Sequence, residues 1–398
     1  MRILHSSDWH LGQHFMGKTR QAEHQALIDW LLAEAQAQQV DAVLLAGDIF
    51  DTGTPPSYAR ELYNRLVLAL KGAGVQLVVL AGNHDSVAML EESKALLGAL
   101  DTLVVASPGD DQLLVLKDGQ GQPGAILCAI PFLRARDLLQ SEAGQSQEDK
   151  QRGLQQAIQD HYQHLYQRAL ARRAELGLEL PIVMTGHLTT VGASASESVR
   201  EIYVGSLEAY PSNGFPPADY IALGHIHRPQ KVGGQDHVRY SGSPIPLSFD
   251  EARQQKEVLL VELAPGQCQV SSLPVPSFQA LASVRGRLEE LRAQVAALCE
   301  GIDSLWLEVQ LEGEEHLADL QARVAEQLEG LPVELLRLRR VRSNQGAALG
   351  REAGETLDEL DPLDVFARRL ACEELEPALA DSLTGLYRQT LASLEEGQ

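Results

Sequence analysis

Polar side chains that commonly bind metal ions follow five strand-like segments of the chain, each at the point where a strand is expected to end. The five segments are 2–7, 40–46, 75–81, 182–185 and 220–223. The side chains that follow them are Asp8 and His10, then Asp48, then Asn83 with His84 and Asp85, then His187, and finally His225 and His227. Because ligands of open α/β sheets bind at the carboxyl ends of strands, we expect these residues to converge.

The mixture of carboxylates, one carboxamide and several imidazoles predicts the type of metal. Oxygen and nitrogen donors together suit Mn²⁺, Fe²⁺ or Zn²⁺ better than Mg²⁺ or Ca²⁺, which prefer oxygen alone. The number of potential ligand side chains also exceeds the six that one octahedral ion can bind. Two ions bridged by a carboxylate could bind all of them. A single such motif is more often a turn or a solvated histidine, but five in order favour a two-metal site.

A second motif competes for the N-terminal region. Residues 12–19 fit the phosphate-loop pattern G-x-x-x-x-G-K-[ST], with Lys18 as its lysine. Four residues separate the expected end of the first strand from Gly12, whereas a phosphate loop begins directly after its strand. The interior of the motif is also bulky, with Phe15 and Met16, although backbone N–H groups would have to surround a phosphate. The metal interpretation accounts for all five motifs, so we favour it over a nucleotide site.

Strand-like and helical patterns alternate through the first half of the chain. Apolar residues at helical spacing predict helices over 20–38 and 58–71, between the strands named above. Further strands are expected at 126–130 and 258–263, and a long polar surface helix between 141 and 179. This alternation is typical of an α/β sandwich with buried sheets.

The C-terminal third has a different pattern. The sequence predicts an α/β domain that carries the metal-binding motifs over 1–275, a small α+β domain over 276–342, a linker over 343–358 and a helical segment over 359–398. Leucines at helical spacing in the last segment, such as Leu379, Leu383 and Leu386, indicate an apolar stripe. The stripe either packs on its own domain or binds a partner, and the length of the linker favours a partner.

Composition limits the class of protein. The four cysteines are scattered and form no C-x-x-C pair, which favours a reducing compartment over a disulfide framework. No signal-peptide pattern and no apolar run long enough to cross a bilayer are present, so we expect a cytoplasmic protein without membrane contact. The formal net charge of −22 opposes unaided binding to a polyanion. Metal ions and a partner would have to supply positive charge if the substrate is nucleic acid.

The ordered motifs D-x-H, GD, GNHD, GH and GHxH resemble those of the calcineurin-like metallophosphoesterases. Within that family, "HSSDWHLG", "AGDIFDTGTPPSYARELYNR", "VLAGNHDS", "DYIALGHIHRPQ" and "YSGSPIPLSFDE" are similar to the SbcD nuclease subunits of bacteria. The resemblance implies a four-layer α/β/β/α sandwich with a small α+β capping domain and C-terminal helices. Archaeal relatives carry a histidine where this chain has Asp51, so the function of that position is open.

The resemblance also implies a ligand set for each ion. Asp8, His10, Asp48 and His227 would hold the first metal, and Asp48, Asn83, His187 and His225 the second. Asp48 would bridge the two, and His84 would act on the leaving oxygen during catalysis. For Asp85 two roles are open: it orients the His84 ring, or it caps the N-terminus of a helix.

The implied activity is hydrolysis of DNA phosphodiester bonds in repair and recombination. By resemblance, an SbcC-type ATPase subunit would join a homodimer of this chain in a heterotetramer. That complex would act as an ATP-dependent double-strand exonuclease and a single-strand and hairpin endonuclease, with two divalent ions, Mn²⁺ being expected. The alternatives are another phosphodiesterase or phosphatase of the same fold, or a scaffold without activity. Four arginines in "LRLRRVR" would contact DNA or lie on a solvated edge strand: Arg337, Arg339, Arg340 and Arg342.

Overall fold

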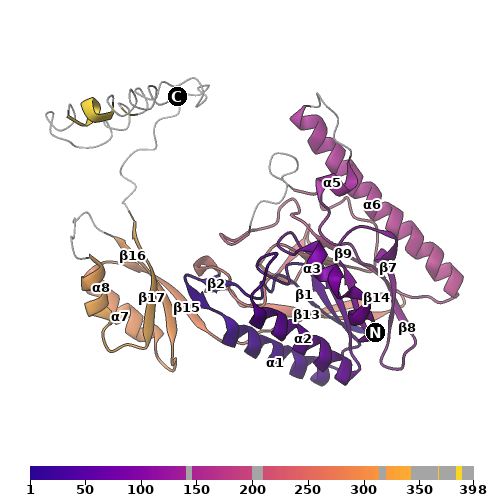
Figure 1. Cartoon of the computed structure of the whole chain (residues 1–398), viewed down its shortest axis with the longest axis horizontal. Coiled ribbons are helices and arrows are strands. Elements are labelled where there is room, and N and C mark those ends of the chain that lie inside the picture. Colours follow the sequence, from indigo (N-terminus) through magenta and orange to yellow (C-terminus); the bar gives the residue numbers. More distant parts are fainter. Residues whose placement is uncertain (140–145, 200–208, 313–319, 342–365, 367–381, 388–398) are drawn as a thin grey trace. The chain divides into compact units, whose positions relative to one another are not determined.

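The computed structural model describes residues 1–398 except 140–145, 200–208, 313–319, 342–365, 367–381 and 388–398 (Figure 1). The chain divides into two compact units. The first comprises Met1–Ser283, Leu298–Glu308 and Leu331–Arg337, and the second Val284–Ala297, Val309–Gly330 and Leu338–Gln398. All of the predicted metal-binding residues lie in the first unit.

The first sheet of this unit carries three of the five motifs. Its six strands lie in the order β14 (Gln267–Pro274), β13 (Glu257–Ala264), β1 (Arg2–Ser6), β4 (Ala42–Ala46), β5 (Gln76–Leu80) and β6 (Thr102–Val105). Strands β1, β4, β5 and β6 are parallel, whereas β13 and β14 form an antiparallel hairpin at the edge. Parallel strands β1, β4 and β5 therefore present their carboxyl ends, and the motifs that follow them, along one edge.

The second sheet carries the other two motifs. Its order is β11 (Gln230–Val232), β12 (Gln235–Tyr240), β10 (Tyr220–Gly224), β9 (Ile182–His187), β8 (Pro123–Cys128) and β7 (Leu113–Lys117). Strands β8, β9, β10 and β12 are parallel, and the two edge strands are antiparallel to their neighbours. His187 and His225 therefore come from adjacent strand ends.

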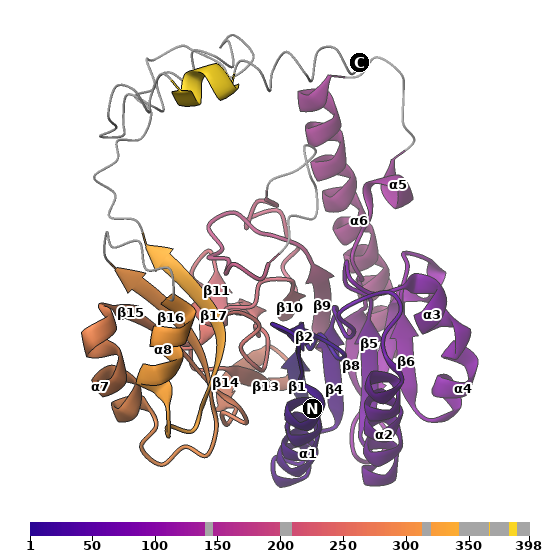
Figure 2. The same ribbon diagram turned by 60° about the vertical axis from the view of Figure 1, so that its left-hand side comes forward.

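The two sheets pack face to face and helices cover their outer faces, as the resemblance implied (Figures 1 and 2). Apolar side chains of both sheets, including Leu44, Val78, Leu127 and Ala222, form the core between them. Helices α1 (Gln21–Ala37) and α2 (Ser57–Ala73) cover the first sheet. Three shorter helices follow in the chain, namely α3 (Val87–Glu92), α4 (Lys94–Ala99) and α5 (Ala135–Leu138). The fold is the predicted α/β/β/α sandwich.

The long helix α6 (Gln147–Leu176) covers the second sheet, in the segment predicted to be a polar surface helix. It buries Leu154, Ile158, Tyr162, Leu165 and Ala169, which recur every three or four residues. This single apolar stripe explains how a helix that is polar overall can still hold its place on the sheet.

Residues 12–19 form a small hairpin and not a phosphate loop. Strands β2 (His14–Phe15) and β3 (Lys18–Thr19) pair antiparallel, and α1 begins only at Gln21. Lys18 forms an ion pair with Glu334. Lys18 therefore lies in a strand of the hairpin and not at the N-terminus of a helix, where the nucleotide interpretation would place it.

The C-terminal elements combine strands and helices. A three-stranded sheet contains β15 (Ala280–Gly286), β16 (Leu305–Glu312) and β17 (Val333–Val341), and the chain between these strands forms α7 (Leu288–Leu298) and α8 (Leu320–Leu328). The predicted linker 343–358 lies outside the described residues, as does most of the helical segment 359–398. The domain boundaries therefore remain predictions.

Candidate metal centre

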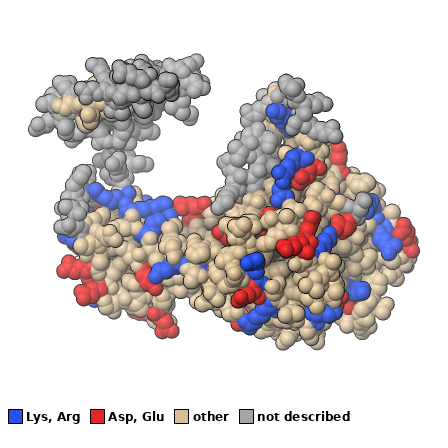
Figure 3. Space-filling view, in the orientation of Figure 1, with Lys and Arg blue, Asp and Glu red and all other residues tan. Residues whose placement is uncertain are grey.

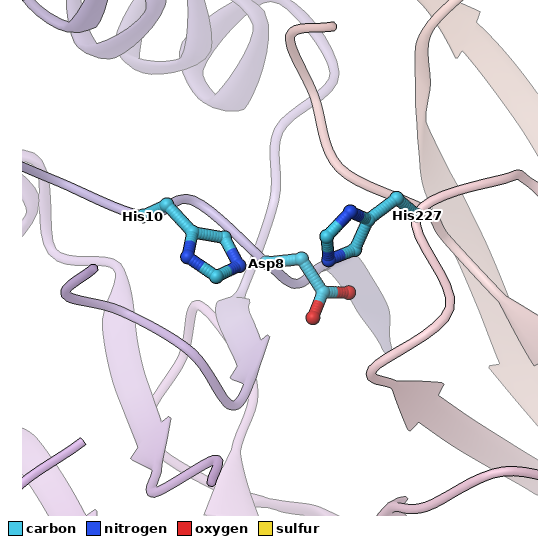
Figure 4. A group of neighbouring side chains, drawn as sticks. All are labelled: Asp8, His10 and His227. Carbon is cyan, nitrogen blue, oxygen red and sulfur yellow. The ribbon is translucent and has the colours of Figure 1, made fainter. Parts of the chain in front are cut away.

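The strand-end motifs of both sheets meet in one place. Three groups of potential ligand atoms lie within 4.8 Å of one another: Asp8 with His10 and His227, His10 with Asp48 and His84, and Asp48 with His187 and His225. Figure 4 shows Asp8, His10 and His227 gathered together, with the two rings on either side of the carboxylate. Asn83 joins the third group, because its Oδ1 lies 3.0 Å from His187 Nε2 and 3.2 Å from His225 Nδ1.

Four of these residues have a backbone conformation that L-amino acids rarely adopt. The φ angles are 55° at Asp8, 47° at His10, 50° at Asp48 and 96° at His225. Positive φ at residues other than glycine is uncommon and costs free energy, and it concentrates at functional sites. The chain therefore turns sharply after three of the strands, which brings side chains of both sheets together.

Glycines before the motifs allow the strand-end loops to approach closely. At Gly47, where φ is 94°, a Cβ atom would lie only 2.2 Å from Nδ1 of His187. At Gly224 it would lie 2.0 Å from the carbonyl oxygen of Ala46. No side chain fits at either position, so the Gly-Asp and Gly-His pairs of the sequence reflect contact between the two sheets.

Asp48 lies at the centre of the cluster. Its Oδ2 is 3.2 Å from His187 Nε2 and 3.7 Å from His10 Nε2, and its Oδ1 accepts a hydrogen bond of 2.9 Å from the backbone N–H of His84. The residue is 1 % exposed. Although burial opposes ionisation, the neighbouring His187 and His10 hold the pKa of Asp48 well below its usual range. Asp48 is therefore an ionised carboxylate within reach of ligands from both sheets.

The hydrogen bonds of His187 test whether a cation fits here. Its Nδ1 donates to the backbone carbonyl of Ala46 at 2.9 Å, so its Nε2 is the atom that a metal would bind. The contacts of that atom are with acceptors, Asp48 Oδ2 and Asn83 Oδ1. Burial lowers the pKa of His187, but Asp48 outweighs it and raises the pKa to about 9. A site that attracts a proton so strongly to Nε2 also suits a divalent cation.

Two further ring nitrogens in the cluster support this. Nε2 of His10 and Nε2 of His225 are buried and make no hydrogen bond in the structure. A buried polar atom without a partner is costly, and coordination to a cation would remove that cost at both nitrogens. The donor set, which contains carboxylate, carboxamide and imidazole groups, fits Mn²⁺, Fe²⁺ or Zn²⁺.

Asp51, whose role the sequence left open, contacts His10. Its Oδ1 lies 3.1 Å from His10 Nδ1. A carboxylate behind a ligating histidine fixes the tautomer and orientation of the ring. Asp51, three residues after Asp48, is thus placed to orient the ring of His10.

His84 lies beside the proposed ligands and faces a cavity. Its ring centroid is 4.7 Å from that of His10, and its Nδ1 donates to the Asp51 carbonyl at 2.8 Å. Both rings line a cavity of ≈ 260 Å³, together with His227 and Arg337 among others. His84 is therefore in a position to meet a substrate that enters this cavity.

Asp85 makes other contacts than either predicted role implies. Its carboxylate accepts hydrogen bonds from the backbone N–H groups of Ile49 (3.1 Å), Phe50 (2.9 Å) and Gly82 (2.8 Å). The cap of helix α3 is instead Ser86, whose hydroxyl accepts from the N–H of Met89. These contacts join the loop after β4 to the loop after β5. The carboxylate therefore holds the backbone of the two loops together.

Two histidines outside the motifs, His5 and His24, are buried, and His5 bonds Tyr220 Oη at 2.9 Å. The arginines of the segment "LRLRRVR" differ in exposure. Arg337 lies over the Phe249 ring, 5.3 Å from its centroid, and pairs with Glu308. Arg339 and Arg340 are exposed on β17, whereas Arg342 lies outside the described residues.

Comparison with known proteins agrees with the geometry. Residues 1–229 match the family model described as calcineurin-like phosphoesterase, and residues 277–374 match one described as type 5 capsule protein repressor C-terminal domain. The chain is 52 % identical to the SbcD subunit of the nuclease SbcCD from Escherichia coli strain K12, over 99 % of this chain and 98 % of the relative. It is 35 % identical to the corresponding subunit from Rhodobacter capsulatus, over 84 % of this chain and 86 % of the relative.

These matches cover both parts of the chain. Among the described residues, no helix is long and apolar enough to span a membrane. A nuclease subunit with a calcineurin-like phosphoesterase domain is a metal-dependent hydrolase. The sequence resemblance is therefore confirmed, and the chain belongs to the SbcD family of nuclease subunits within the calcineurin-like phosphoesterases.

Proposed function

We propose that seven residues of this chain hold two divalent metal ions, most suitably Mn²⁺, and that the site hydrolyses DNA phosphodiester bonds. Asp8, His10, Asp48 and His227 would hold one ion, and Asp48, Asn83, His187 and His225 the other. The observation that carries the proposal is the convergence of these ligand atoms around Asp48, with two buried imidazole nitrogens left without hydrogen bonds.

The chain's own residues prepare the site for this reaction. Bound divalent ions would activate a water molecule and neutralise the charge that develops on the phosphate. Asp51 orients the ring of His10, and the Ala46 carbonyl orients that of His187. The buried strand ends keep these side chains in one arrangement, so little reorganisation is needed when substrate arrives.

His84 is the residue we propose for proton transfer. Its Nδ1 carries a proton, because the Asp51 carbonyl can only accept. Nε2 is then the ring atom that can exchange a proton with the substrate. Since His84 lines the cavity beside His10 and His227, it would stabilise or protonate the leaving oxygen.

The negative charge of the chain bears on how DNA is bound. Figure 3 shows acidic and basic side chains intermixed over the face in view, and the formal net charge is −22. Such a chain attracts a polyanion weakly by itself. The E. coli and R. capsulatus relatives are named as subunits of SbcCD. We propose that an SbcC-type ATPase supplies much of the DNA-binding surface, with this chain present as a homodimer in a heterotetramer.

Within that complex we propose ATP-dependent exonuclease action on double strands and endonuclease action on single strands and hairpins. The family membership supports this substrate class over small phosphodiesters. A cytoplasmic location, where DNA and a reducing environment coincide, is part of the same proposal.

Replacement of Asp48 tests the site. Asp48→Ala removes the carboxylate that both proposed ions share, so we expect nuclease activity with Mn²⁺ to fall to background and metal content to fall by at least one ion per chain. Hairpin DNA and a small phosphodiester are assayed in parallel, with elemental analysis of the dialysed protein. Asp101→Ala, at an exposed ion pair with Lys71, is the control. Unchanged activity and metal content in the Asp48 variant would refute the assignment.

A further inference from the structure

A second set of polar side chains contacts His227 at Nδ1, and one of them, Ser198, lines the same cavity as His10. Ser198 Oγ is 2.6 Å from His227 Nδ1, and the same hydroxyl donates to Glu251 Oε1 at 2.5 Å. Glu251 Oε1 is itself 3.4 Å from His227 Nδ1. Neither Ser198 nor Glu251 belongs to the strand-end motifs, and the side chain of Glu251 is 0 % exposed.

Glu251 acts as an acceptor in every contact described for its carboxylate. Oε2 accepts from the backbone N–H of Leu247 at 2.9 Å and from Lys256 Nζ at 2.7 Å. Oε1 accepts from Ser196 Oγ at 2.6 Å as well as from Ser198. A buried carboxylate is retained only when it is paired and hydrogen-bonded in this way.

The positions of the protons follow from these contacts. A serine hydroxyl has one proton, and that of Ser198 is donated to the carboxylate of Glu251. The Ser198 oxygen must therefore accept at His227, which places the proton of the neutral imidazole on Nδ1. The lone pair is then on Nε2, the nitrogen that remains for a ligand shared with Asp8 and His10.

Lys256 fixes the backbone of the same residue. Its Nζ donates to the backbone carbonyl of His227 at 3.0 Å and to Ser243 Oγ at 3.0 Å. Lys256 is 4 % exposed. The ring of His227 is thus held from Nδ1 and its main chain from the carbonyl, by a network with Glu251 at its centre.

We propose that Ser198 and Glu251 are positioning residues for the first metal ion: they hold His227 in the Nδ1–H tautomer with Nε2 directed at the ion. The inference rests on the proposed metal site. Partners of this kind behind a metal-bound histidine typically account for about 10- to 100-fold in metal affinity. Because Ser198 and Glu251 contact His227 and not His187 or His225, their removal should weaken one ion and spare the other.

The test is a calorimetric titration of the full-length metal-free chain with MnCl₂. For Ser198→Ala we expect one binding event to weaken about 10- to 100-fold while the other is unchanged. Ser198→Thr keeps the hydroxyl and should restore the affinity. Ser194→Ala is the matched control, since this exposed serine of the same segment contacts Arg228 and not His227. Glu251→Gln should show the same selective loss, but it also disturbs Lys256, so Ser198→Ala is the decisive variant.

A second readout does not depend on metal. ¹⁵N NMR of histidine-labelled protein reports the tautomer of His227, which we expect to be Nδ1–H in the wild type and a mixture in Ser198→Ala. Equal Mn²⁺ affinities in the wild type and Ser198→Ala, or an Nε2–H tautomer in the wild type, would overturn the inference. A wild-type chain that binds no Mn²⁺ would instead overturn the proposed metal site, so the two failures are distinguishable.

Discussion

At the scale of single residues, the site combines side chains that the sequence identifies with others that it does not. The convergence of the residues at the ends of β1, β4, β5, β9 and β10 could be predicted, because metal-ligand types recur at strand ends in one order. The contacts of Asp51 with His10, and of Ser198 and Glu251 with His227, could not, because these residues come from distant parts of the chain. The sequence offered one signal for Glu251: it is the last residue of "YSGSPIPLSFDE", a segment that resembles the family.

Replacement of His84 tests whether metal binding and catalysis are carried by different residues, as proposed. The His84 ring forms a hydrogen bond with the Asp51 carbonyl and lines the cavity beside His10. Because His84 belongs to neither proposed ligand set, His84→Ala should keep both ions and slow DNA cleavage by roughly 10²-fold or more, the usual range for a lost acid–base group. Elemental analysis and a single-turnover cleavage assay measure the two quantities. Loss of metal in this variant would make His84 a ligand.

At the scale of elements, the strands that carry motifs were predicted to within a few residues, since most of them are largely apolar runs followed by glycine or a polar residue. Strands such as β12 and β14 were missed, because each is an edge or near-edge strand with polar and partly exposed positions. Whether such segments form strands depends on their pairing with neighbouring strands and not on their own sequence pattern. The hairpin of β2 and β3 was not predicted either. The sequence motif gave reasons against a phosphate loop but did not indicate which structure residues 12–19 form instead.

Asp85 shows how two elements are joined at the site. Its three hydrogen bonds from the N–H groups of Ile49, Phe50 and Gly82 connect the loops after β4 and β5. In Asp85→Asn one oxygen becomes an NH₂ group that faces backbone donors. We therefore expect the free energy of unfolding to fall by about 1–3 kcal/mol, measured by urea denaturation.

Asp101→Asn, at an exposed ion pair, serves as the control and should change stability by at most about 1 kcal/mol. If Asp85→Asn keeps wild-type stability and metal content yet loses cleavage activity, Asp85 has the catalytic role predicted from the sequence and its contacts to the backbone are secondary.

At the scale of the whole molecule, a strongly acidic chain belongs to a family of nuclease subunits. If the site hydrolyses DNA as proposed, positive charge would come from bound metal ions and from a partner. Segment 350–398 has twelve carboxylates and four arginines, with leucines at helical spacing. An acidic segment with an apolar stripe suits a basic, apolar groove on another chain.

Deletion of residues 359–398 tests the partner segment. We expect the truncated chain to keep its metal and a weak, ATP-independent cleavage of single strands, and to lose both association with an SbcC-type ATPase and ATP-dependent processing of DNA ends. A pull-down and a thermal melt beside the full chain are the measurements. Partner binding at full strength would place the interface elsewhere, and a collapsed melt would show that the segment belongs to the folded core.

The central claim is that the strand ends of two sheets hold two divalent ions around Asp48. Anomalous scattering from a crystal of the full chain grown with Mn²⁺ tests it most directly. We expect two peaks, one bounded by Asp8, His10, Asp48 and His227 and the other by Asp48, Asn83, His187 and His225. A single peak, or manganese bound away from Asp48, would contradict the account.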